Sequence, residues 1–221
     1  MKTLIVLPAY NESKVLAETL KKLRASTDAS VLVVDDGSTD RTGEIALKSG
    51  ARVARHVVNL GLGAAIETGL EIARREGYDT LVTFDADGQH NPADIEKLTK
   101  AISGSDVAIG VRKVHSERMP LIKRIGNQTL NLLTGLVFGV YSTDSQSGLR
   151  AFNRKAIKSV RLKANRYEVS SEILYEAKVN GLRIKEVPVE TIYTEHSISR
   201  GTGVLDGFKI LWRMILHSRG E

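Results

Sequence analysis

Several features common in other protein classes are missing from this chain of 221 residues. There is no cysteine, which excludes disulfides and thiolate metal sites, so any metal must be bound by oxygen or imidazole. Aromatic residues make up only 5% of the chain and form no base-stacking motif, so nucleic acid is not an expected partner. No apolar run approaches the length of about 18 residues that a membrane-spanning helix needs.

The remaining composition is that of a soluble globular protein, with 42% hydrophobic and 26% charged residues. The net charge of +6 favours anionic lipid or phosphorylated small molecules as partners, although a basic solvated surface would give the same value. The first apolar run stops at Pro8, too early for a signal peptide. We therefore expect a cytoplasmic protein, with residues 1–200 forming one domain and 201–221 a C-terminal amphipathic helix.

The first half of the chain alternates strands and helices. Short apolar runs predict strands at 3–7, 31–34, 52–56, 81–84 and 107–109. Apolar residues at helical spacing predict helices at 14–25, 41–48, 61–76 and from Pro92 to Ile102. This alternation predicts an α/β fold whose mostly parallel sheet carries helices on both faces.

The second half is less regular. A long apolar helix is expected at 121–141, a loop entering a strand at 143–153, a helix at 169–180 and a strand at 182–189. A polar loop at 194–203 leads to the last helix.

Acidic residues follow two of the predicted strands. Asp35 and Asp36 end the second strand, and Asp85 and Asp87 follow the fourth, which we expect to be its neighbour. Ligands of parallel sheets bind beyond these carboxyl ends. Two carboxylates so close in sequence can share a hard divalent cation, with Gln89 as a further ligand, although Asp-rich turns also occur without function.

A glycine-rich segment, Asn59 to Gly63, opens the helix at 61–76. It is similar to the start of the dinucleotide fingerprint, but Ile66 occupies the third glycine position and the segment follows the third strand, so NAD binding is rejected. A phosphate at this helix N-terminus and a simple tight turn both remain open.

Taken together, these segments resemble the motifs of family 2 glycosyltransferases, in the order and spacing of that family. The motifs are Pro8-Ala9-Tyr10-Asn11-Glu12, Asp35-Asp36-Gly37-Ser38, Asn59-x-Gly61-x-Gly63, and Asp85-Ala86-Asp87-Gly88-Gln89. A later segment, Asp144 to Phe152, is similar to a motif of the dolichyl-phosphate-mannose synthase branch. The resemblance implies a GT-A fold, a nucleotide-sugar donor linked through GDP or UDP, and transfer with inversion.

The resemblance also implies roles for individual residues. The nucleotide-binding set comprises Pro8, Ala9, Tyr10, Glu12, Asp36, Asp85, Arg124 and Arg200. The metal, Mg²⁺ or Mn²⁺, falls to Asp85, Asp87 and Gln89. The catalytic set comprises Asp87, Arg112 and Asp144. A phosphate acceptor is already anionic at neutral pH and needs no strong base, since its second pKa lies near about 6. Asp144 could therefore instead orient the acceptor or anchor Arg150.

A basic stretch indicates contact with a membrane surface. Arg112, Lys113, Arg118, Lys123 and Arg124 precede the apolar segment 125–140, and Phe208, Trp212 and Ile215 lie on one face of the last helix. Such elements are typical of the lipid interface, although core packing is the alternative. We expect a peripheral protein on the cytoplasmic face of the membrane, either alone or with a membrane-anchoring subunit.

Three functions are consistent with these features. The first is transfer of a hexose or N-acetylhexosamine to a polyprenyl (dolichyl) phosphate. The second keeps the fold and donor but uses a polysaccharide or another non-lipid acceptor. The third is a nucleotide-binding subunit without turnover, which the complete acidic set at Asp36, Asp85 and Asp87 disfavours.

Overall fold

A computed structural model of the chain describes residues 1–112, 131, 135, 136, 138–164, 168–190 and 192. Its centre is a seven-stranded sheet in the order β3-β2-β1-β4-β6-β5-β7. The strands are β1 (Thr3–Ala9), β2 (Ser30–Asp35), β3 (Arg52–Arg55), β4 (Thr80–Thr83), β5 (Val107–Arg112), β6 (Arg150–Asn153) and β7 (Ile184–Val189). The helices are α1 (Leu16–Ser26), α2 (Thr42–Lys48), α3 (Leu62–Arg75), α4 (Asp94–Ala101), α6 (Arg154–Ser159) and α7 (Val169–Val179).

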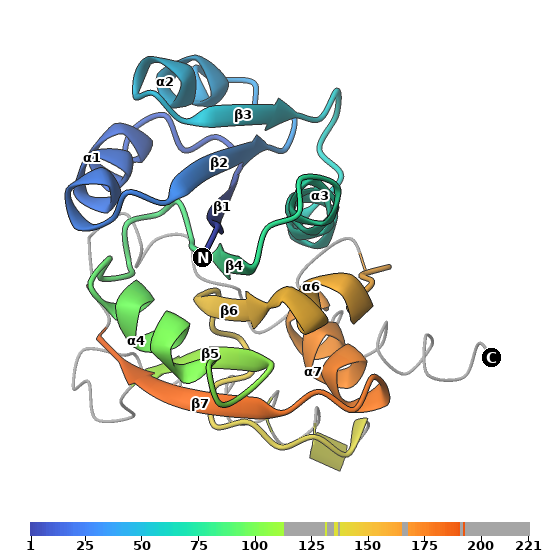
Figure 1. Ribbon diagram of the computed structural model, residues 1–221. Helices are drawn as coiled ribbons and strands as arrows, with labels where there is room; N and C mark the ends of the chain where they lie inside the picture. Colours follow the sequence, from blue (N-terminus) through green and yellow to red (C-terminus); the bar gives the residue numbers. More distant parts are fainter. Residues whose placement is uncertain (113–130, 132–134, 137, 165–167, 191, 193–221) are drawn as a thin grey trace.

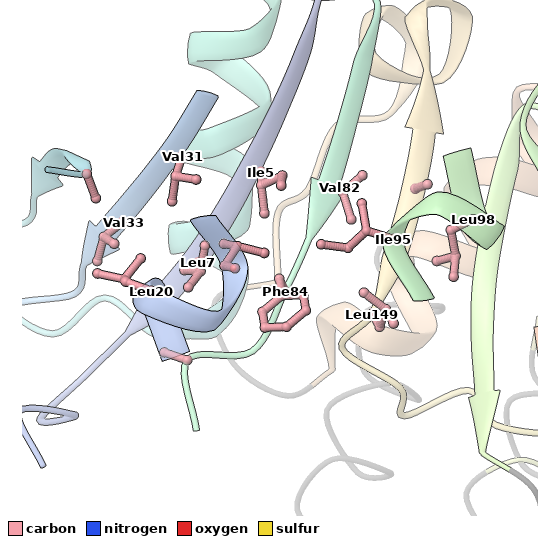
Figure 2. Packing of buried hydrophobic residues seen from close by; sticks show 14 of the residues in the cluster. Ile5, Leu7, Leu20, Val31, Val33, Val82, Phe84, Ile95, Leu98 and Leu149 are labelled. Carbon is pink, nitrogen blue, oxygen red and sulfur yellow. The ribbon is translucent and has the colours of Figure 1, made fainter. Parts of the chain in front are cut away.

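Two apolar layers hold the helices against the sheet. Helices α1, α2 and α4 pack on one face, and α3, α6 and α7 pack on the other (Figure 1). Figure 2 shows the first layer, where Leu20 of α1 and Leu98 of α4 lie over side chains of the strands. Gly69 of α3 lies so close to Val6 that an added Cβ would overlap its side chain, so this helix sits directly on β1. These layers fix the ends of the strands, where the acidic residues lie.

One strand runs against the others. β6 pairs antiparallel with both β4 and β5, with Thr83 opposite Arg150, whereas every other pairing in the sheet is parallel. The connection that enters β6 therefore arrives at the same edge of the sheet at which β4 ends. This insertion brings residues 144–150 next to Asp85.

Most of the predicted elements are confirmed within one to three residues, including the loop that enters β6 and the helix α7. The mostly parallel sheet is confirmed as well. Pro188 lies inside β7, an edge strand, where a missing N–H is tolerated. The short helix α6, capped by the Asn153 side chain, was not predicted.

One expectation about the sheet was wrong. β2 and β4 are not neighbours, because β1 lies between them. Of the helix predicted at 121–141, only a few residues are described, and they include helical Asn131 and Leu136. The polar loop at 194–203 and the C-terminal helix at 201–221 lie outside the described residues. Within the described ranges, no helix combines the length and apolarity that crossing a membrane requires.

Candidate functional site

The loops after β1 and β2 are joined by hydrogen bonds at the carboxyl edge of the sheet. Asn11 has a positive φ of 55°, a conformation that asparagine tolerates better than most residues. Its backbone N–H donates to Ser38 Oγ at 3.0 Å, and its side-chain oxygen accepts from the Thr39 N–H at 2.9 Å. The Glu12 N–H donates to Thr42 Oγ1 at 2.8 Å. The segment Pro8 to Glu12 is thereby fixed to the turn after Asp35, as a shared nucleotide pocket would require.

Asp36 joins this edge to the start of α3. Its carboxylate accepts the backbone N–H groups of Leu60 at 2.9 Å and Gly61 at 2.8 Å, and it contacts His56 Nδ1 at 2.7 Å. His56 Nε2 contacts Thr68 Oγ1 at 2.9 Å. The Asp36 carboxylate therefore binds two N–H groups of the glycine-rich turn, those of Leu60 and Gly61, and a phosphate at the N-terminus of α3 stays a prediction. The predicted contact between Asp36 and the base or ribose stays a prediction.

Asp85 lies at the centre of the described site. Its carboxylate contacts Nε2 of the buried His90 at 2.8 Å, and the His90 ring packs edge-on against Phe84 with ring centroids 5.5 Å apart. Gly148, from the loop before β6, lies so close that a Cβ there would overlap both Asp85 carboxylate oxygens. Thr83 Oγ1 donates to the Gly148 carbonyl at 2.7 Å and holds this approach. The loop is therefore packed directly against the acidic cluster.

The two carboxylates of this cluster have opposite pKa shifts. Burial would raise the pKa of Asp85, but the hydrogen bond and charge of His90 outweigh it and lower the pKa, helped by Arg150 and Arg112. Burial, followed by the negative charge of Asp85, raises the pKa of Asp87. Asp85 is thus held as an anion, and its charge makes a second negative charge at Asp87 unfavourable. A cation between the two would relieve this repulsion.

The metal ligands predicted from sequence lie together but do not form a complete metal shell. Asp87 accepts the Gln89 backbone N–H at 3.0 Å and the Gln89 side-chain amide at 2.6 Å, so Gln89 orients Asp87 through its nitrogen. In the part of the chain that the structure describes, no three His, Cys, Asp or Glu side chains are arranged to bind a metal by themselves. Two carboxylates supply only part of the ligands of a hard divalent cation. The remaining coordination positions of such an ion can be taken by phosphate oxygens.

Arg112, at the end of β5, forms a two-pronged ion pair with Asp144. Its Nε donates to one carboxylate oxygen at 2.6 Å and its Nη2 to the other at 2.7 Å. Its positive charge also reaches Asp85 and His90. Asp144 is therefore engaged by Arg112, whereas Arg150 donates to the backbone carbonyls of Ser145 and Ser170. The negative charge of Asp144 also acts on Arg150, so an anchoring role toward Arg150 and a direct catalytic role both stay predictions.

A second arginine, Arg150, is buried beneath the site. Its Nη2 donates to the backbone carbonyls of Ser145 at 2.8 Å and Ser170 at 3.4 Å, while its buried Nε has no hydrogen-bond partner among the described residues. Burial lowers its pKa to about 10, opposed by the charges of Asp85 and Asp144. The group remains a cation near neutral pH, so the acidic cluster faces positive charge from β6 as well as from β5.

The structure thus brings together Asp85, Asp87, Gln89, Arg112 and Asp144. It places Pro8, Ala9, Tyr10, Glu12 and Asp36 along the same edge of the sheet, with Tyr10 exposed. Arg124 and Arg200 lie outside the described residues. Sequence reasoning considered His90 as a residue near the diphosphate but did not predict its contact with Asp85, and it missed the tight approach of Gly148. The signal for both was present, since His90 follows the metal motif directly and Gly148 lies inside the later motif.

The comparisons with known proteins agree with this geometry. Residues 4–161 match the family described as glycosyl transferase family 2. The chain belongs to glycosyl transferase family 2. This glycosyltransferase is 41% identical, over 98% of its length and 96% of the relative's, to the UDP-N-acetylglucosamine–dolichyl-phosphate N-acetylglucosaminyltransferase of Methanococcus voltae. It is 34% identical, over 91% of its length and 82% of the relative's, to the polyprenol monophosphomannose synthase of Mycolicibacterium smegmatis.

Solved structures confirm the GT-A fold of the glycosyltransferase. Glucosyl-3-phosphoglycerate synthase from Mycobacterium tuberculosis, crystallised with Mn²⁺, UDP and glucosyl-3-phosphoglycerate, superposes with a TM-score of 0.71. The match covers 97% of this chain and 77% of that one at 23% identity. At this identity the likeness concerns the fold alone.

Proposed function

We propose that this glycosyltransferase moves a hexose or N-acetylhexosamine from a nucleotide diphosphate sugar to a polyprenyl phosphate, with inversion at the anomeric carbon. The observation that carries the proposal is the acidic pair Asp85 and Asp87 beyond the end of β4, with the Arg112 guanidinium, held by Asp144 at the end of β5, close enough for its charge to act on Asp85. Relatives named as polyprenyl-phosphate sugar transferases, aligned over nearly the whole chain, support the acceptor.

The donor diphosphate requires a divalent cation in this proposal. Asp85, Asp87 and Gln89 would hold Mg²⁺ or Mn²⁺, which supplies charge neutralisation for the leaving nucleoside diphosphate. Crystal structures of the mycobacterial synthase contain Mn²⁺ or Mg²⁺ with UDP, which supports this choice of ion. The raised pKa of Asp87 fits a site completed by a cation.

The chain's own residues then orient two phosphates. Arg112, whose guanidinium is held by Asp144, would stabilise the negative charge that develops on the leaving diphosphate. An oxygen of the acceptor phosphate attacks the anomeric carbon as the bond from that carbon to the diphosphate oxygen breaks and its electron pair leaves with the diphosphate. The acceptor oxygen is already anionic, because a monophosphate has its second pKa near about 6, so no side chain has to remove a proton.

One assay tests the acceptor. Purified enzyme with Mg²⁺ or Mn²⁺ is given UDP- and GDP-linked sugars and either a polyprenyl phosphate or a soluble oligosaccharide. The proposal expects product only on the lipid phosphate, and the donor that reacts identifies the nucleotide. Product only on the oligosaccharide would instead support transfer to a polysaccharide or another non-lipid acceptor. A protein that binds donor but neither transfers nor hydrolyses the sugar would be a nucleotide-binding subunit.

Asp36→Ala is expected to weaken nucleotide binding by about 10-fold or more. The variant removes the acceptor of the Leu60 and Gly61 N–H groups, so the turn before α3 loses the contacts that hold it at the nucleotide edge. Isothermal titration with the free nucleotide and with the sugar donor measures the effect. Unchanged nucleotide affinity together with lost turnover would instead make Asp36 a residue of the transfer step.

Membrane association is proposed to be peripheral, on the cytoplasmic face and either direct or through an anchoring subunit. Exposed Leu136 and Tyr141 follow the basic stretch, whose residues 113–124 lie outside the described ranges. Basic residues near anionic lipid contribute about 1 kcal/mol each. The purified protein should therefore cosediment with anionic liposomes at low salt, and the double change Lys123→Glu and Arg124→Glu should release it.

A charge-matched control separates local attraction from net charge. Lys21→Glu with Lys22→Glu changes the same number of charges on the exposed surface of α1 and should release much less protein. Equal release by both variants would assign binding to the overall charge. Failure of the wild type to bind anionic liposomes at any salt concentration would contradict direct association.

A further inference from the structure

A carboxylate outside the family motifs holds the loop on which Asp144 lies. Glu186, on β7, accepts three hydrogen bonds from the two residues before Asp144. Ser142 Oγ donates to Oε1 at 2.8 Å, the Thr143 N–H to Oε1 at 2.7 Å and Thr143 Oγ1 to Oε2 at 2.7 Å. The Asp144 N–H lies 3.3 Å from Ser142 Oγ and donates to it, which extends the chain of contacts to Asp144 itself.

Asn131 holds the same loop from a second direction. Its side-chain oxygen accepts the Ser145 N–H at 2.9 Å and Ser145 Oγ at 2.7 Å, and its amide nitrogen donates to the Thr143 carbonyl at 2.7 Å. Asp144 is thus flanked on both sides in sequence by residues whose polar groups are bound. Glu186 and Asn131 lie far apart in the chain, and within the described ranges their hydrogen bonds go to Ser142, Thr143 and Ser145 and not to the acidic cluster.

This arrangement fixes the position of Arg112 through Asp144. Its guanidinium is held by both oxygens of Asp144, and its backbone N–H also donates to Asp144 at 3.2 Å. A bidentate arginine–carboxylate pair fixes the plane of the guanidinium as well as its position. Any movement of Asp144 therefore moves the Arg112 guanidinium relative to Asp85. The positive charge of Arg112 acts on Asp85 and helps to lower its pKa.

We propose that Glu186 and Asn131 are positioning residues for sugar transfer: they fix Asp144, and Asp144 holds the Arg112 guanidinium against the acidic cluster. The inference rests on the proposed function, because it assigns Arg112 to the transferring phosphates. A displacement of about 1 Å at a reacting group can cost about 100-fold in rate. Glu186 acts here through hydrogen bonds and not through its charge.

A conservative and a truncating substitution of Glu186 distinguish an effect of its hydrogen bonds from an effect of its charge. Glu186→Gln keeps an oxygen for Ser142 Oγ and the Thr143 N–H, and its amide can donate to Thr143 Oγ1, whose hydroxyl rotates to accept. Glu186→Ala loses all three contacts. We expect kcat/KM for transfer to fall about 10- to 100-fold in Glu186→Ala and to remain within about threefold of the wild type in Glu186→Gln. Glu96→Ala, which removes an exposed carboxylate from α4, is the control for lost charge.

A double-mutant cycle with Arg112→Met distinguishes positioning from general loss of stability. If Glu186 acts only through Arg112, adding Glu186→Ala to Arg112→Met should change the rate less than about twofold, because coupled residues are not additive. Asn131→Ala should likewise reduce transfer in the wild-type background and have little effect in Arg112→Met. This variant tests the inference if Glu186→Ala does not fold. Melting temperature and affinity for the free nucleoside are measured in parallel, and the nucleoside affinity should stay within about twofold.

Three results would overturn the inference. They are unchanged transfer by both alanine variants, a loss in Glu186→Gln as large as in Glu186→Ala, and full additivity with Arg112→Met. Failure of the proposed function is distinguishable, since the wild type would then make no polyprenyl product. The same cycle could still be measured with the acceptor that is used or by hydrolysis of the donor.

Discussion

Asp87→Ala is expected to reduce sugar transfer by about 100- to 1000-fold, the range found when one group that stabilises a transition-state charge is removed. The fold should be retained, because Asp87 lies beyond the end of β4 and its side chain is only partly buried. The variant also removes the electrostatic repulsion between the carboxylates of Asp87 and Asp85. The melting temperature of the metal-free protein should therefore not fall. Initial rates, Mn²⁺ binding by electron paramagnetic resonance and thermal unfolding measure the three quantities.

The control for Asp87→Ala is Asp28→Ala, which removes an exposed carboxylate between α1 and β2 and should leave transfer and Mn²⁺ binding unchanged. Full transfer by wild-type enzyme stripped of metal with EDTA would contradict the metal assignment. Retained Mn²⁺ binding in Asp87→Ala with lost transfer would instead place Asp87 in contact with the sugar.

Gly148→Ala should be nearly as damaging as loss of a metal ligand, although it adds only a methyl group. The new Cβ would overlap both Asp85 oxygens, so either the carboxylate or the loop before β6 must move. Because Thr83 holds the Gly148 carbonyl from β4, the loop has little freedom and Asp85 is expected to be displaced. We expect at least a 100-fold loss of transfer together with weaker Mn²⁺ binding.

Gly104→Ala is the matched control for Gly148→Ala. Apart from Gly104 and its two chain neighbours, no atom of the described residues lies within 4 Å of the position that a Cβ would take there, and the backbone is not in the left-handed region. Replacing glycine there should be neutral or slightly stabilising, since alanine restricts the unfolded chain. Wild-type Mn²⁺ affinity in Gly148→Ala would show that the loop yields and Asp85 does not.

The position of the acidic residues at one edge of the sheet could be predicted because each of them lies close in sequence to a strand end. Asp36 follows β2 directly and Asp85 and Asp87 lie shortly after β4, so the rule that ligands bind at carboxyl ends places them at one edge of the sheet. Their order across the sheet could not be predicted, because local periodicity does not say which strands pair. β1 was therefore not expected between the two acidic clusters.

The remaining contacts depend on partners distant in sequence. Nothing near Glu186 indicates that its carboxylate binds Ser142 and Thr143, since a glutamate on an edge strand is usually a solvated residue. Arg150 follows the same logic, because arginine is rarely buried and only the tertiary structure shows it beneath Asp85. Such residues emerge only when the strand order is known.

The place of β6 in the sheet has a consequence for synthesis of the chain. Among the described residues, β5 pairs only with β6 and β7, and both follow it in sequence. A nascent chain that has not reached Arg150 therefore carries β5 without a partner and leaves one edge of β4 bare, a known route to aggregation. Fragments that end between residues 112 and 149 should accordingly be insoluble, although they contain all four motifs between Pro8 and Gln89.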